Sequence, residues 1–218
     1  MIFALSSQGV DQVIFGVANV LEVPVLILAL LSLAIVIYEL GSFAVELNSR
    51  RRRVFADISL AADRARAALL SDDRPGAAAA VSGVARSAAM QRTLGFIVEH
   101  ARKAGSEHQL NKALADFDFG SQRRLARTRM LVRAGPALGL MGTLIPLSPA
   151  LTGLANGNTT ALSHNLRVAF SVTVVGLLIG AVAFALSLSR DRMYGQDLSD
   201  LEYLAAVMND PRVDGGSG

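Results

Sequence analysis

Long stretches without charged residues dominate the hydropathy pattern of this chain. Crossing a hydrocarbon layer of about 30 Å takes about 20 apolar residues at about 1.5 Å each. One apolar stretch covers residues 23–38 and continues with little charge to residue 47, and a longer one covers residues 134–189, where Arg167 is the only charged side chain. The pattern predicts an all-α integral membrane protein with three transmembrane helices, the first over residues 23–47.

Turn chemistry divides the longer stretch into two spans. The Asn-Gly-Asn segment at residues 156–158 favours a turn. We therefore expect transmembrane helices over residues 131–154 and 162–189, joined by a turn at residues 155–161. These two helices form a hairpin.

Polar and alanine-rich sequence separates the first span from this hairpin and predicts long helical extensions. Within residues 48–130 we expect one helix over residues 54–70, a second over residues 77–103 and a third that starts near Glu107 and continues unbroken into the hairpin. After the hairpin, leucines at three-residue spacing predict that the last helix continues into residues 190–218, which end in a flexible Gly-Ser tail.

The first 22 residues precede the first span and carry apolar side chains every three to four positions. These are Phe3, Val10, Ile14, Val17 and Leu21. This spacing is typical of an amphipathic helix lying on a membrane surface. We expect an outer amphipathic segment over residues 1–22.

The placement of basic residues predicts the orientation. Of the 21 Lys and Arg residues, 20 lie in residues 48–133 or after residue 189, and Arg167 is the exception. The positive-inside rule places such residues in the cytoplasm. The N-terminus and the hairpin turn are therefore expected outside, and residues 48–130 and the C-terminus inside, in the inner (cytoplasmic) membrane. Because this asymmetry explains the basic residues, they do not indicate nucleic-acid binding.

Motifs of enzymes and metal sites are absent from the sequence. It contains no P-loop, no G-x-S-x-G elbow, no H-E-x-x-H helix and no cysteine. His100, His108 and His164 are far apart, and solvated or capping roles suit them better than metal ligation. We expect no enzymatic activity, no metal and no cofactor.

Small and polar residues recur every three or four positions in the hairpin. In its first helix they are Gly135, Gly139, Gly142, Thr143, Pro146 and Pro149; in its second they are Ala169, Thr173, Gly176, Gly180 and Ala183. Such stripes let helices approach closely and suggest a tightly packed, multi-chain bundle.

Two interpretations of these stripes remain open from the residues alone. A threonine in a membrane helix commonly bonds to a carbonyl of its own helix, in which case the stripes serve packing. Pro146 and Pro149 free the carbonyls of Gly142 and Ile145, which lipid tolerates only if neighbours or water satisfy them. A bend beside a water-filled lumen would do so, and so would burial against a partner helix.

The hairpin also carries a paired motif. It reads Gly-Pro-Ala-Leu-Gly-Leu-Met-Gly-Thr at residues 135–143 and Thr-Val-Val-Gly-Leu at residues 173–177. This pair, on three spans with a large insertion after the first, resembles the MotA/TolQ/ExbB proton-channel family. The resemblance implies a homopentameric ring around a dimer of a single-span ExbD/TolR/MotB-like partner, in which proton flow drives energy transduction such as rotation or protein transport.

The resemblance also implies roles for individual residues. Thr143 and Thr173 would line the inner surface that faces the partner helices, with Ser171 a secondary candidate. The sequence departs from relatives shortly after the Gly-Thr pair, where they commonly have glycine and this chain has Pro146, followed by Pro149. It also departs where it has no glutamate early in the third span: Val168 stands there, beside an Arg167 that we expect at the outer mouth, snorkelling to headgroups.

Residues 134–189 contain no Asp, Glu or Lys, and His164 falls at the expected outer turn. A proton relay through lipid normally needs a protonatable group, so this group is expected on the partner, as an aspartate of its single span. Glu39 and Glu46 lie near the cytoplasmic end of the first span and suit pairing with arginines.

The leading hypothesis is therefore a ring-forming subunit that lines an ion path. The alternative is a non-conducting membrane scaffold that binds partner helices. A secondary transporter is less consistent with three spans that hold neither an internal ionisable group nor a repeat.

Overall fold

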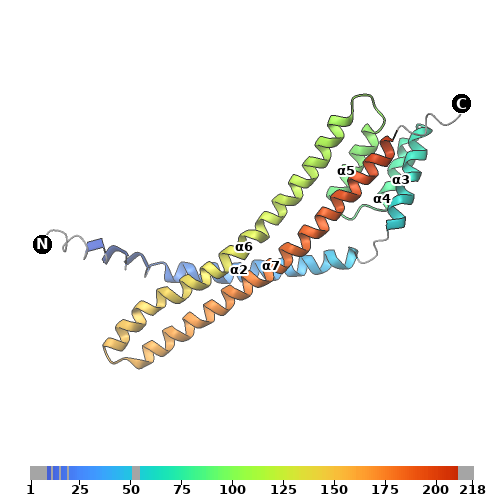
Figure 1. The fold of residues 1–218 in the computed structure, drawn as a ribbon. Coiled ribbons are helices and arrows are strands. Elements are labelled where there is room, and N and C mark those ends of the chain that lie inside the picture. The colour runs from blue at the N-terminus through green and yellow to red at the C-terminus, as the bar shows by residue number, and fades with distance from the viewer. Residues whose placement is uncertain (1–8, 11, 15, 19, 51–54, 211–218) are drawn as a thin grey trace. The chain divides into compact units, whose positions relative to one another are not determined.

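The computed structural model describes residues 9–10, 12–14, 16–18, 20–50 and 55–210, and they form helices joined by short loops (Figure 1). The helices are α2 (Glu22–Arg50), α3 (Phe55–Leu70), α4 (Arg74–Ser82), α5 (Ala88–His100), α6 (Glu107–Ala155) and α7 (Thr159–Asn209). No strand occurs among these described residues, which confirms the predicted all-α fold.

Among the described residues, three helices are long and apolar enough to cross a membrane, as predicted. They cover Gln12–Leu47, Glu107–Ala155 and Thr159–Asn209. The last two are single continuous helices that extend far beyond their apolar parts, so the predicted continuations from Glu107 into the hairpin and from the hairpin past residue 190 are also confirmed.

The chain divides into two compact units. One, here called the apolar unit, comprises Met1–Phe43 and Arg127–Ser187; the other, here called the polar unit, comprises Ala44–Ala126 and Leu188–Gly218. Each unit has a core of its own.

In the apolar unit, α2 buries one face and exposes the rest. Its buried residues recur every three or four positions, and they are Val25, Ala29, Ser32 and Val36. Val36 packs with Ile179 and Ala183 of α7, beside Leu131 of α6. Leu28, Leu31 and Ile35 are about half exposed or more. A helix that buries one stripe and exposes leucine and isoleucine elsewhere suits a lipid-facing position against the hairpin.

The segment before α2 is helical at its described positions up to Val20, and Leu21 forms a turn. Val10, Ile14 and Val17 are exposed there. Phe3, which belongs to the expected amphipathic segment, lies outside the described residues.

The hairpin turn consists of a helix stop followed at once by a helix start. Gly157 has a φ of 75°, in the region that glycine adopts at least cost. Its N–H donates to the Leu154 carbonyl at 2.9 Å, and the N–H of Asn158 donates to the Gly153 carbonyl at 2.8 Å, the pattern of a Schellman cap. The Asn158 side chain then accepts from the N–H of Ala161 at 3.0 Å and caps α7.

In the polar unit, the predicted single helix over residues 77–103 is wrong. The structure has α4 and α5 in its place, with a break after Ser82. Gly83 follows the end of α4, and the Ser87 hydroxyl starts α5 by accepting from the N–H of Met90 at 3.1 Å. The alanine-rich composition favours helix throughout this stretch, and local capping by Ser87 outweighs that preference.

The core of the polar unit is formed by α3, α4 and α5 together with the first part of α6 and the last part of α7. Its largest fully buried side chains include Ile58, Met90, Leu94, Ile97, Leu201, Leu204 and Met208. At one end, Arg74 donates to the carbonyls of Val98 and Glu99 at 2.8 and 2.7 Å. The N–H of Arg102 donates to the Asn209 side chain at 2.8 Å. The start of α4 and the ends of α5 and α7 therefore lie together at this end of the unit.

Candidate functional site

The two hairpin helices approach each other along their glycines. A methyl group built on Gly176 would lie 2.6 Å from the carbonyl oxygen of Gly135 and 2.7 Å from Cα of Gly139. A methyl group on Gly135 would lie 2.8 Å from the backbone nitrogen of Gly180. Because real side chains essentially never come so close to backbone atoms, this helix separation requires glycine. The two stripes pack against each other within one chain, whereas the sequence pattern suggests packing between several chains.

Gly142 and Pro136 extend this contact along the hairpin. A methyl group on Gly142 would lie 2.9 Å from Cβ of Val172, and one on Gly180 would lie 2.8 Å from Cδ of Pro136. We call this contact the seam, formed by Gly135, Pro136, Gly139 and Gly142 of α6 and by Val172, Thr173, Gly176 and Gly180 of α7.

Thr173 lies at the edge of the seam and is half-buried. Its hydroxyl lies 3.0 Å from the carbonyl oxygen of Ala169 in its own helix and 3.4 Å from that of Gly139 in α6. Ile179 of α7 packs with Val36 of α2. Six residues separate Ile179 from Thr173, and at about 100° per residue their side chains project about 120° apart around α7. Thr173 therefore lies on the flank of the hairpin that is turned away from α2.

Thr143 follows Gly142 and is also half-buried. Its hydroxyl donates to the carbonyl oxygen of Leu140 at 2.7 Å. Since Thr173 reaches Gly139, one helical turn before Thr143, the two hydroxyls lie at neighbouring levels of the hairpin. Each donates within its helix and keeps oxygen lone pairs that can accept a further hydrogen bond.

Ser171 and Arg167 lie on a different face of α7, and both are exposed. The Ser171 hydroxyl donates to the carbonyl oxygen of Arg167 at 2.8 Å. Two residues correspond to about 200° of rotation, so Ser171 and Thr173 point in nearly opposite directions. The structure thus places Thr143 and Thr173 at neighbouring levels of the hairpin, whereas Ser171 and Arg167 lie on a different face of α7 from Thr173.

Pro136, Pro146 and Pro149 all lie inside the continuous helix α6. Pro146 is buried and Pro149 half-buried. Pro146 lies on the same stripe as Gly142, whose carbonyl it leaves without a helical donor. The buried position of Pro146 agrees with burial against a helix, which is one of the two solutions that the sequence leaves open.

The central part of the hairpin offers hydroxyl and carbonyl groups and no carboxylate. Residues 134–189 contain no Asp, Glu or Lys, and the exposed Arg167 and His164 lie towards the turn. Within the described part of the chain, no three His, Asp or Glu side chains gather as metal ligands would. These central groups can accept or relay hydrogen bonds, and none of them is a side chain that titrates near neutral pH.

Comparison with known families identifies this architecture. The model of the MotA/TolQ/ExbB proton channel family matches residues 78–197. The chain belongs to this family. The match begins within α4, includes α5 and all of α6, and ends in α7, so it extends well beyond the paired motif of the hairpin. No curated protein matches the chain.

Membership in the MotA/TolQ/ExbB family makes the chain a membrane subunit of the proton-channel, motor-associated type. The three apolar helices agree with this assignment. Within such a subunit, Thr143 and Thr173 carry hydroxyls near the middle of the hairpin, and Thr173 lies on its side away from α2.

A buried charged cluster in the polar unit was not singled out by the sequence pattern. The Arg86 guanidinium lies 3.2 Å from Asp200 and 3.7 Å from Asp197, whose side chains are only 5% and 1% exposed. Asp197 falls on the same helical stripe as Leu201 and Leu204, which are fully buried. An acidic residue on an apolar stripe is the signal in the sequence that could have indicated this cluster.

Proposed function

We propose that this chain forms the ring of a proton-driven motor or energy-transducing complex of the inner membrane, with five copies around a single-span partner. The observation that carries the proposal is the chemistry of the central hairpin, which has the Thr143 and Thr173 hydroxyls and no carboxylate over residues 134–189. Since a membrane proton path normally needs a protonatable group, the partner supplies it, as an aspartate on its own span.

The proposed orientation has the N-terminus and the hairpin turn outside and the polar unit in the cytoplasm. Its support is the distribution of Lys and Arg, of which only Arg167 lies towards the turn. Arg167 is exposed and lies near the outer end of the hairpin, where its long side chain reaches the headgroups.

In this proposal the threonine hydroxyls guide the proton to and from the partner carboxylate. The Thr173 oxygen can accept a hydrogen bond from a protonated carboxyl group while its own proton stays bonded to the Ala169 carbonyl. Contact with Thr173 thereby favours the neutral carboxyl group, and moving out of reach of the hydroxyl favours release of its proton.

The experiment replaces Thr173 with valine, which keeps the branched shape and removes the hydroxyl. The complex is isolated from its native membrane through a tag on this chain and reconstituted into liposomes that contain a pH-sensitive dye. We expect Thr173→Val to abolish proton flux and Thr173→Ser to retain most of it. Ser171→Ala is the matched control on the opposite face, and it should conduct normally.

Full proton flux in Thr173→Val complexes of normal size would refute the proposed role. The rival function, a non-conducting scaffold, is favoured by one observation, namely that both threonine hydroxyls bond to carbonyls of their own helix. It predicts that wild-type complexes are as proton-tight as empty liposomes, so the same assay separates the two functions.

A further inference from the structure

The polar unit has a groove between α5 and the first part of α6 that the proposed ion path does not use. Its volume is about 720 Å³, and Phe96, Ala113 and Phe117 contribute apolar surface to it. Three of the four charged side chains that line it are basic. The basic ones are Arg92, Lys112 and Arg124; the fourth, Asp116, is paired with Lys112.

The groove has the length of a short helix. On α6 its lining runs from His108 to Arg124, which corresponds to about 24 Å at about 1.5 Å per residue. Helix α3 has 16 residues and therefore about the same length. No residue of α3 lines the groove of its own chain.

The outer face of α3 complements the groove in both polarity and charge. Leu60 and Leu70 are 48% and 47% exposed, and Ala67 lies exposed between them. Asp57, Asp63 and Arg64 lie exposed on the same face, because positions three or four apart are neighbours on a helix. An exposed apolar stripe whose charged neighbours are two acids and one arginine has a net negative charge, which suits an apolar groove with a mostly basic rim.

The α3 face and the groove also lie at matching positions along the helix axes of the polar unit. The end of α3 is joined by a short loop to Arg74, which bonds to the end of α5. A short loop after α5 also leads to the start of α6, so both surfaces begin at this end and run about the same length from it. When neighbouring copies are related by a rotation about an axis parallel to these helices, each residue keeps its level along that axis. Asp57 of one copy then lies near the level of Arg124 of the next copy.

We propose that α3 of one copy docks into the α5–α6 groove of the next copy, so that the chains join head to tail. Because the two surfaces differ, the contact is heterologous and closes into a ring when the rotation permits. This inference rests on the proposed ring and names the contact that forms it.

Cross-linking tests the contact cleanly, because the chain contains no cysteine. The variant Ala67→Cys/Ala113→Cys places one thiol on the α3 face and one in the groove. Treatment of native membranes with a short bifunctional thiol reagent should give a ladder of multimers that ends at the size of the ring. Two singly substituted, co-expressed chains should give dimers only, since each carries one thiol.

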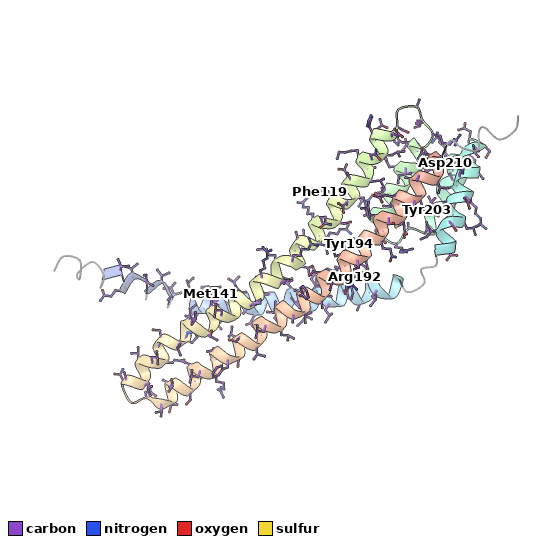
Figure 2. All side chains as sticks on the ribbon, in the orientation of Figure 1. Phe119, Met141, Arg192, Tyr194, Tyr203 and Asp210 are labelled. Carbon is purple, nitrogen blue, oxygen red and sulfur yellow. The ribbon has the colours of Figure 1, made fainter. Side chains whose placement is uncertain are left out.

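The matched control is Ala67→Cys/Ala115→Cys. Ala115 is exposed on α6 close to the level of Ala113 but does not line the groove, and about 200° of helix separates them. Phe119, one turn after Ala115, is 71% exposed and projects outward from α6 (Figure 2). The control pair should therefore remain monomeric on the gel.

Three results would overturn the inference while leaving the ring intact. They are an equal ladder from the control pair, no ladder from Ala67→Cys/Ala113→Cys in particles of ring size, and capture of a different polypeptide by the groove thiol. If light scattering instead showed that the particles are monomers, the proposed ring itself would be refuted.

Charge reversal provides a second test that needs no reagent. Arg124→Glu should cause loss of ring-sized particles, and adding Asp57→Arg should restore them. Arg123→Glu is the control, because Arg123 is an exposed neighbour that does not line the groove. Equal effects of both arginine variants, or no rescue by Asp57→Arg, would contradict the proposed contact.

Discussion

Replacing Gly176 with alanine should separate the two hairpin helices, because the added methyl group has no room between them. It would lie 2.6 Å from the carbonyl oxygen of Gly135 and 2.7 Å from Cα of Gly139, whereas ordinary contact begins at 3.4 Å. The helices must therefore move apart by up to about 0.8 Å at this point. Both obstructing atoms belong to the backbone, so no side-chain rotation can relieve the overlap.

The magnitude follows from two opposing effects. Overpacking of this kind typically costs about 1–3 kcal/mol, and exchanging glycine for alanine inside a helix returns up to about 1 kcal/mol of helix propensity. We expect a net loss of about 1–2 kcal/mol, which for a chain of this size corresponds to a fall in melting temperature of roughly 2–8 °C. The loss should be larger for Gly176→Val, whose side chain is bulkier.

Gly195→Ala is the control on the same helix, because a methyl group there meets nothing within 4 Å. Melting in detergent can be followed by circular dichroism at the helix band, with wild type and both variants in the same micelles. The control should melt at or slightly above the wild-type temperature. If Gly176→Ala melted as high as Gly195→Ala, the close approach of the helices at the seam would be refuted.

Three further predictions concern the polar unit and the turn. Arg86→Met removes the guanidinium beside the buried carboxylates of Asp197 and Asp200 and should destabilise the polar unit by about 3–5 kcal/mol. Limited proteolysis should then cleave that unit faster than in the wild type, and an unchanged cleavage rate would contradict this prediction. Asn158→Ala should cost about 1 kcal/mol through loss of the α7 cap, and Gly157→Ala about 1–2 kcal/mol because its φ of 75° strains alanine. Melting temperatures equal to wild type would disprove either effect.

The spans could be predicted from the sequence because they depend on length and polarity alone. Residues 134–189 hold enough apolar sequence for two spans, and the Asn-Gly-Asn segment at 156–158 has the residues that a helix stop and a helix start require. The break between α4 and α5 was harder to predict, since Ser82, Gly83 and Ser87 interrupt a run whose alanines favour helix. Its boundary depends on one capping bond, from the N–H of Met90 to Ser87.

The partner of the glycine stripes could not be predicted from the sequence, because spacing shows that a helix can approach closely but not which helix does. In the structure Gly135 and Gly139 meet Gly176 of the same chain. The opposition of Ser171 and Thr173, by contrast, follows from helix geometry alone. Placing Thr173 away from α2 required the structure, since it depends on the packing of Ile179 with α2.

Use of the glycine stripes within one chain limits how copies of the hairpin can recognise one another in the membrane. The remaining outer faces carry large apolar side chains such as Leu144, Leu151, Val174 and Leu177, all more than half exposed. Lipid is as apolar as these faces, so burying them against another copy gives little directional preference. The register between copies must then come largely from outside the apolar unit. The polar unit has complementary charges that can provide it in the proposed ring, so reversing Arg124 should dissociate that ring while each hairpin keeps its seam.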